Sequence, residues 1–165
     1  MKKIMRFTLM LAAALLLGAC SKEEIPMTNT VALAGEWMMT VDIVDGDEVL
    51  EDPYGLGQML FITYNVNDDS AKEMWLDDLG NFWGTRVVIP CSVESMTFGS
   101  STPVDNVDYD PIKVTVTNGK ITPGGTTSPS GMPADAIECY IEYEDDPGTI
   151  YYIHGYRRTG FVADE

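Results

Sequence analysis

The sequence predicts an all-β domain built from short antiparallel strands. Runs rich in valine, isoleucine, threonine and aromatic residues recur between clusters of glycine, proline, asparagine and aspartate, which is typical of strands joined by turns. Beyond residue 19, no segment has the sustained apolar spacing of an amphipathic helix. Strands of this kind either close into a barrel or pack face to face as a β-sandwich.

Nine strands are expected from the alternation of side chains. In the first, Trp37, Met39, Val41 and Ile43 fall on one side and the polar Glu36, Thr40 and Asp42 on the other. Asn118-Gly119 is the strongest two-residue hairpin signal, since both positions of a type I′ turn need a positive φ. A longer turn near Asp77 to Asn81 predicts a second hairpin. The expected strands are 35–44, 57–66, 71–77, 82–91, 93–99, 112–117, 120–123, 136–144 and 149–158.

Two long stretches interrupt the strand pattern and are expected to be loops. They cover Gly99 to Pro111 and Pro123 to Ala134, and the second is rich in glycine, proline and serine. Loops of this length are often functional or mobile.

The N-terminus predicts a cleaved leader. Basic residues precede the apolar run Phe7 to Leu17, which is too short to cross a bilayer comfortably. The run ends in "LGAC", which resembles the lipobox of bacterial lipoproteins. That resemblance implies that Cys20 receives a diacylglycerol and that cleavage occurs before it. We therefore expect a signal peptide over 1–19, a lipidated tether over 20–32 and a β-domain over 33–165.

The residues after Cys20 indicate where in the cell the protein is expected to be located. The acidic segment "SKEE", Ser21 to Glu24, resembles the surface-export signal of Bacteroidetes-type lipoproteins. The implied location is the outer membrane, facing the cell surface. The same segment also reads as a solvated linker.

The charge of the chain excludes some classes of binding partner. Its 165 residues contain 26 acids and 10 bases, for a formal net charge of −16. Three of the bases lie in the expected leader, so the mature chain is still more acidic. A charge of this sign argues against nucleic acid and against binding of anionic lipid headgroups. No nucleic-acid partner is expected.

Two cysteines remain after Cys20, and they leave two alternatives open. Cys91 and Cys139 both fall on the apolar side of an expected strand, so they either form a disulfide or stay as buried thiols. Neither has the spacing of a zinc site. The acidic segments 45–47 and 105–110 do not match an EF-hand loop, so no metal and no cofactor are expected.

Several stretches resemble, in order, the lipoprotein family called lipid-binding putative hydrolase. The most specific are "MWLDD" followed by "NFW" at 74–83, and "GYRRTGF" at 155–161. The resemblance implies a lipocalin-like, calycin-type up-and-down barrel of about eight strands. In lipocalins a Gly-x-Trp opens the first strand, and an arginine of the last strand stacks over the tryptophan. Here the matching residues are Gly35 and Trp37, with Arg157 or Arg158.

The family name implies a lipid or another small amphiphile as ligand. The residues expected to line a binding cavity are apolar or aromatic, and each could equally belong to an ordinary β core: Met39, Phe61, Trp75, Trp83, Ile141, Tyr143, Tyr151 and Ile153. The alternative is a surface interaction or glycan-binding lipoprotein with a solid core. It would present Tyr54, Tyr109 and Trp83 to a sugar or to a surface lipoprotein assembly.

The second activity in the family name, hydrolysis, has little support in the residues. The sequence contains no Gly-x-Ser-x-Gly elbow, and His154 is its only histidine. We expect no hydrolase activity and assign no catalytic residue.

Overall fold

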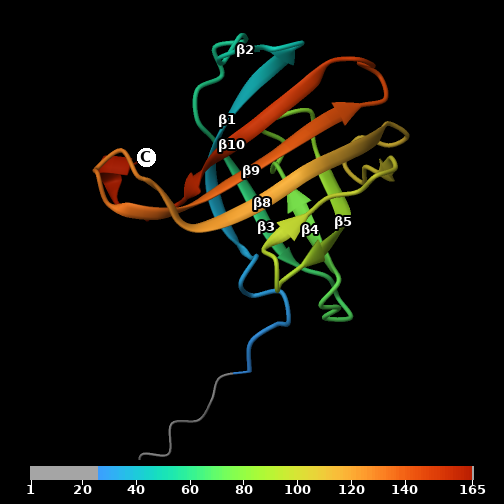
Figure 1. Ribbon diagram of the computed structural model, residues 1–165. Coiled ribbons are helices and arrows are strands. Elements are labelled where there is room, and N and C mark those ends of the chain that lie inside the picture. The colour runs from blue at the N-terminus through green and yellow to red at the C-terminus, as the bar shows by residue number, and fades with distance from the viewer. Residues whose placement is uncertain (1–25, 165) are drawn as a thin grey trace, which may run out of the picture.

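The computed structural model describes residues 26–164 (Figure 1). The expected leader, Cys20 and the first part of the expected tether lie outside the described residues. The strands are β1 (Gly35–Asp45), β2 (Glu48–Leu50), β3 (Met59–Asn65), β4 (Glu73–Asp77), β5 (Arg86–Ser92), β6 (Thr97–Phe98), β7 (Val104–Asp105), β8 (Lys113–Thr127), β9 (Pro133–Tyr143) and β10 (Ile150–Arg157), followed by the short 3₁₀ helix η1 (Val162–Asp164).

Eight of the strands form a closed antiparallel barrel. The order is β1-β3-β4-β5-β6-β8-β9-β10, and β10 pairs with β1 to close it. This closing register is long, running from Trp37 opposite Arg157 to Val44 opposite Ile150. β2 extends the end of β1, and β7 pairs with β8 outside this path. The predicted all-β, up-and-down barrel is confirmed, and the β-sandwich alternative is wrong.

Alternation along the strands places one side of each in the barrel interior. In β1, for example, Trp37, Met39 and Val41 are buried, as are Met74 and Leu76 in β4. These side chains join those of the other barrel strands in one continuous apolar cluster. We call the end of the barrel near Trp37 the lower end, and the end carrying the β4–β5 turn, residues 78–85, the upper end.

The expected hairpin at Asn118-Gly119 is wrong. The two strands expected around it are parts of the single strand β8, which carries a bulge between Thr117 and Lys120. Asn118 has a φ of 52°, but Gly119 does not have a positive φ. Gly119 instead pairs with Phe98 of β6, and a Cβ at this glycine would collide with the Phe98 ring. The glycine is therefore needed for a close approach between strands rather than for a turn.

Several other strand and loop boundaries differ from those expected. The expected loop 123–134 is mostly strand, because β8 continues to Thr127 and β9 already starts at Pro133. Residues 82–85 belong to the β4–β5 turn and not to a strand, and the strand expected over 93–99 shrinks to the two residues of β6. The pairing of β2 with β1 was not expected at all.

Candidate functional site

Trp37 and Arg157 meet at the lower end of the barrel. Trp37 is fully buried, and the guanidinium carbon of Arg157 lies 4.3 Å from the centre of its ring. Arg157 Nη1 also donates to the carbonyl of Ala34 at 2.8 Å, and Nε donates to Asp135 at 2.9 Å. A hydrogen bond from the Gly124 amide, helped by Arg157, holds the pKa of Asp135 below its usual value. The arginine therefore ties β1, β9 and β10 together over the indole.

Gly35 makes room for this arrangement. A Cβ at residue 35 would collide with the guanidinium of Arg157, so any side chain there would displace the arginine. The indole Nε1 of Trp37 donates to Thr63 at 2.8 Å, and the Thr63 hydroxyl donates to the Leu33 carbonyl at 2.6 Å. Arg158, the other arginine considered, pairs with Glu36 on the outside at 2.8 Å. The lower end is thus closed by Trp37 and Arg157.

Most of the residues expected to line a cavity point into the barrel. They are almost wholly buried and pack against one another, so that the interior is filled by side chains rather than hollow. These six are Met39, Phe61, Ile141, Tyr143, Tyr151 and Ile153.

Trp75 was expected in the lining but lies on the outer face of the barrel. Its neighbours Met74 and Leu76 take the two interior positions of β4, and alternation sends Trp75 outward. There it stacks on Tyr64, with ring centres 6.0 Å apart, and the guanidinium of Arg86 lies 5.8 Å from its ring. The assignment of Trp75 to an interior site is therefore wrong.

Trp83 lies in the β4–β5 turn and covers the upper end. It stacks on Tyr143 with ring centres 4.9 Å apart, and Tyr151 is 5.7 Å away. The hydroxyl groups of both tyrosines are hydrogen-bonded. That of Tyr143 shares a 2.6 Å hydrogen bond with Thr85, and that of Tyr151 donates to Asp146 at 2.6 Å. Burial raises the pKa of both Tyr143 and Tyr151. The aromatic rings seal the upper end as Trp37 seals the lower.

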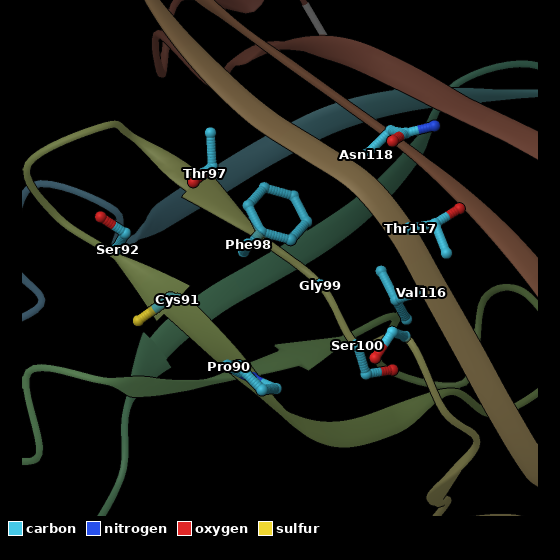
Figure 2. A pocket seen from close by; sticks show the side chains of 11 residues that line it. Pro90, Cys91, Ser92, Thr97, Phe98, Gly99, Ser100, Val116, Thr117 and Asn118 are labelled. Carbon is cyan, nitrogen blue, oxygen red and sulfur yellow. The ribbon is translucent and has the colours of Figure 1, made fainter.

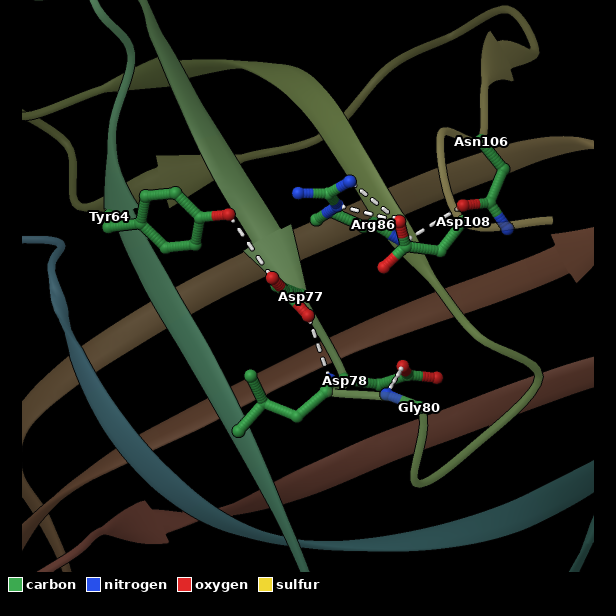
Figure 3. A network of polar contacts seen from close by, with 8 residues as sticks. Tyr64, Asp77, Asp78, Gly80, Arg86, Asn106 and Asp108 are labelled. Carbon is green, nitrogen blue, oxygen red and sulfur yellow. Dashed lines mark hydrogen bonds and ion pairs between the residues drawn. The ribbon is translucent and has the colours of Figure 1, made fainter. Parts of the chain in front are cut away.

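A polar network fixes the β4–β5 turn (Figure 3). Asp78 is buried and accepts hydrogen bonds from the amides of Gly80 at 2.7 Å and Phe82 at 3.0 Å. Burial raises the pKa of Asp78 despite these bonds. The preceding carboxylate, Asp77, accepts from the Leu79 amide at 2.7 Å. The sequence "DDLGN" could have indicated this anchoring role, since aspartates commonly bond to backbone amides two residues later.

A hollow of about 420 Å³ opens on the side of the barrel (Figure 2). It lies where β6 separates β5 from β8, and β6 is only two residues long. The lining combines apolar side chains with uncharged hydroxyl and amide groups and contains no charged residue: Pro90, Cys91, Ser92, Thr97, Phe98, Gly99, Ser100, Ser101, Val116, Thr117 and Asn118. We call it the seam hollow. None of its residues was expected as a ligand site.

One lining residue has an unusual hydroxyl. Ser100 is buried, and its Oγ has no hydrogen-bond partner within the described part of the chain. A buried hydroxyl without a partner is costly, so such groups are commonly satisfied by water or by a ligand.

The two cysteines are free thiols and do not form the disulfide that we considered. Cys91 lines the seam hollow, whereas Cys139 points into the core from β9. Burial raises the pKa of the Cys91 thiol, and that of Cys139 to about 12. Both thiols are therefore free, but only Cys139 is buried, whereas Cys91 is partly exposed.

His154 pairs with Asp42 on the outside of the barrel. Its Nε2 lies 2.9 Å from the Asp42 carboxylate, and its ring stacks on Tyr152 with centres 4.7 Å apart. Within residues 26–164, no serine, threonine or cysteine is hydrogen-bonded to this imidazole. The same residues contain no cluster of three or more histidine, cysteine or carboxylate side chains that could hold a metal, and no helix long and apolar enough to cross a membrane.

Comparison with known proteins identifies the family. No curated protein sequence matches the chain. The sequence profile of one family does match it, over residues 22–162, and therefore covers the whole barrel. The chain belongs to the family described as lipid-binding putative hydrolase.

Proposed function

We propose that this protein is a membrane-anchored lipoprotein that binds a lipid or similar amphiphile at the seam hollow. The observation that carries the proposal is the mixed lining of this hollow, together with membership of a lipid-binding family. Pro90 is exposed to the hollow, the almost wholly buried Phe98 borders it, and serines and threonines surround them. Such a lining suits a molecule with an apolar part and an uncharged polar part.

The barrel wall is thinnest at this hollow. β6 contributes only two residue pairs to β5 and two to β8, far fewer than β9 contributes to β8 or β10. Phe98 fills the gap and reaches the core. In our proposal, an acyl chain inserted here takes the place of the Phe98 ring against the core, so that no preformed cavity is needed.

Charge favours an uncharged polar group on the ligand. The lining has no ionisable residue except the Cys91 thiol, whose raised pKa keeps it neutral. An anionic headgroup would also meet the repulsion of a chain with a net charge of −16. The Ser100 hydroxyl would gain a partner from a hydroxylated headgroup.

The anchor in this proposal is Cys20. Lipidation at the "LGAC" motif, with a second acyl chain, would hold the protein stably on a membrane. The "SKEE" segment supports the outer membrane and its outer face as the location, where other surface lipoproteins would be candidate partners. The segment 26–34 joins the barrel at its lower end, so the anchor would leave the upper end pointing away from the bilayer (Figure 1).

The first test separates bound lipid from the anchor. A Cys20→Ser chain cannot be lipidated, so any lipid extracted from the purified protein and identified by mass spectrometry is non-covalently bound. We expect lipid in the extract. Ser101→Trp should abolish most of it, because Ser101 is exposed and a large ring there would fill the seam hollow.

Thr127→Trp is the matched control, since Thr127 is exposed at the far end of β8 and is not part of the hollow. We expect it to retain the lipid. A Cys20→Ser chain without lipid, which also fails to take up an added uncharged lipid, would refute the proposal. Equal amounts of bound lipid in the Ser101→Trp and Thr127→Trp chains would refute the seam hollow as the binding site.

A further inference from the structure

A second hollow, of about 400 Å³, lies at the upper end of the barrel. Its lining brings together the β4–β5 turn and the loop before β8: Trp83, Gly84, Asp108 and Tyr109. It shares no residue with the seam hollow. Trp83 is partly exposed and Tyr109 is 42% exposed, so both rings are accessible to a ligand.

The loops that form this hollow are held in place. Asp78 fixes the turn that carries Trp83, as described above. The loop that carries Tyr109 is tied to β5, because Arg86 pairs with Asp108 at 2.7 Å and the Arg86 amide donates to Asn106 at 2.8 Å (Figure 3). The two aromatic side chains are thus presented from supported backbone on both sides.

A carboxylate links the two rings. Trp83 Nε1 approaches Asp145 at 3.4 Å, and a hydrogen bond to Asp145 raises the pKa of Tyr109. Asp108 forms an ion pair with Arg86. By contrast, none of the ion pairs among the described residues includes Asp145. Two aromatic rings therefore line the hollow, and Asp145, which is not itself part of the lining, is hydrogen-bonded to both of them.

We propose that this upper hollow binds an organic ammonium ion, such as a trimethylammonium group. Such ions are attracted to the faces of tryptophan and tyrosine, and a nearby carboxylate adds to the attraction. A metal ion fits less well, since no cluster of three ligating side chains exists among the described residues. The group could belong to a free small cation or to a lipid headgroup. The inference does not rest on the proposed function, because the seam hollow plays no part in it.

Choline and its uncharged isostere 3,3-dimethylbutan-1-ol provide the test. The three tryptophans of the Cys20→Ser chain give three indole N–H signals by NMR, and Trp83→Phe identifies the signal of Trp83. Choline should shift that signal and leave the signal of the buried Trp37 unchanged. The isostere should bind at least about tenfold more weakly, because it keeps the shape but lacks the charge.

Two variants locate the site. Tyr109→Ala should weaken choline binding about two- to fivefold, the loss expected for one exposed cation–π contact. Asp145→Asn should weaken it by a similar factor, whereas Asp47→Asn should not, although it removes the same charge from an exposed turn. A second titration with lysophosphatidylcholine shows whether the cation binds more tightly free or within a lipid. Equal affinity for choline and the isostere, or affinity that neither Tyr109→Ala nor Asp145→Asn lowers, would overturn the proposal.

Discussion

Replacing Arg157 by methionine tests how the lower end of the barrel is held. The change keeps an apolar chain of similar length but removes the charge and all donors. The stacking on the fully buried Trp37 is worth about 1–2 kcal/mol. The hydrogen bond from the charged group to the Ala34 carbonyl adds about 1.5–3 kcal/mol. The pair with Asp135 adds no more than about 1 kcal/mol, because both side chains are 32% exposed.

These contributions overlap, so we expect Arg157→Met to lower the free energy of unfolding by about 2–4 kcal/mol. The measurement is the midpoint and slope of urea unfolding, followed by tryptophan fluorescence. Arg158→Met is the matched control. Its arginine pairs with the exposed Glu36, so the expected loss is below about 1 kcal/mol.

A double-mutant cycle isolates the stacking itself. Trp37→Phe with Arg157→Met should show a coupling energy of about 0.5–2 kcal/mol. Equal losses in the two arginine variants, or a coupling energy of zero, would refute the reasoning that Arg157 stabilises the barrel through the ring of Trp37.

Three further predictions concern other parts of the barrel. Burial raises the pKa of Asp78, so its contribution to stability is present below the unfolded pKa and is lost as the pH rises through the raised folded value. Asp78→Asn should therefore flatten the fall in urea midpoint above pH 4, and an unchanged pH profile would contradict this. In the Cys20→Ser chain, a thiol reagent should modify Cys91 in the native state and Cys139 only after unfolding, whereas a disulfide would leave no reactive thiol. Gly119→Ala should destabilise the barrel by about 1–3 kcal/mol, because its methyl group collides with Phe98, and an unchanged midpoint of urea unfolding would contradict this close approach.

The closure of the barrel is the part of the structure most accessible to sequence reasoning. The first and last strands of an up-and-down barrel are neighbours, which is why Trp37 and Arg157 can be considered together although they are far apart in the chain. Strand alternation also identifies most interior residues, because every second residue from Trp37 to Val41 in β1 and from Ile137 to Tyr143 in β9 is apolar and buried.

The same signal fails where apolar residues are adjacent. In β4, Met74, Trp75 and Leu76 follow one another, so the periodicity does not show which of them faces outward. At Asn118-Gly119 the local turn preference is overridden by a tertiary contact, since Phe98 occupies the space beside the glycine.

The sequence predicted neither hollow as a whole, although Trp83 and Tyr109 of the upper one were among the aromatic residues expected to face a ligand. Each is lined by segments that are distant in sequence, and their residue types are ordinary for turns and strand ends. The lining of the seam hollow depends on how short β6 is, and sequence patterns locate strand boundaries poorly.

The shortness of β6 has a consequence for the rate at which a ligand could be exchanged. A barrel with eight equally long strands can admit a molecule through its wall only by breaking many hydrogen bonds at once. Here the break is confined to the few bonds around Thr97 and Phe98, while the long β8–β9 and β10–β1 ladders stay paired. Amide protons of β6 should therefore exchange with solvent well before those of β1 and β10. We therefore expect the rate at which β6 opens locally to set the residence time of a ligand bound at the seam hollow.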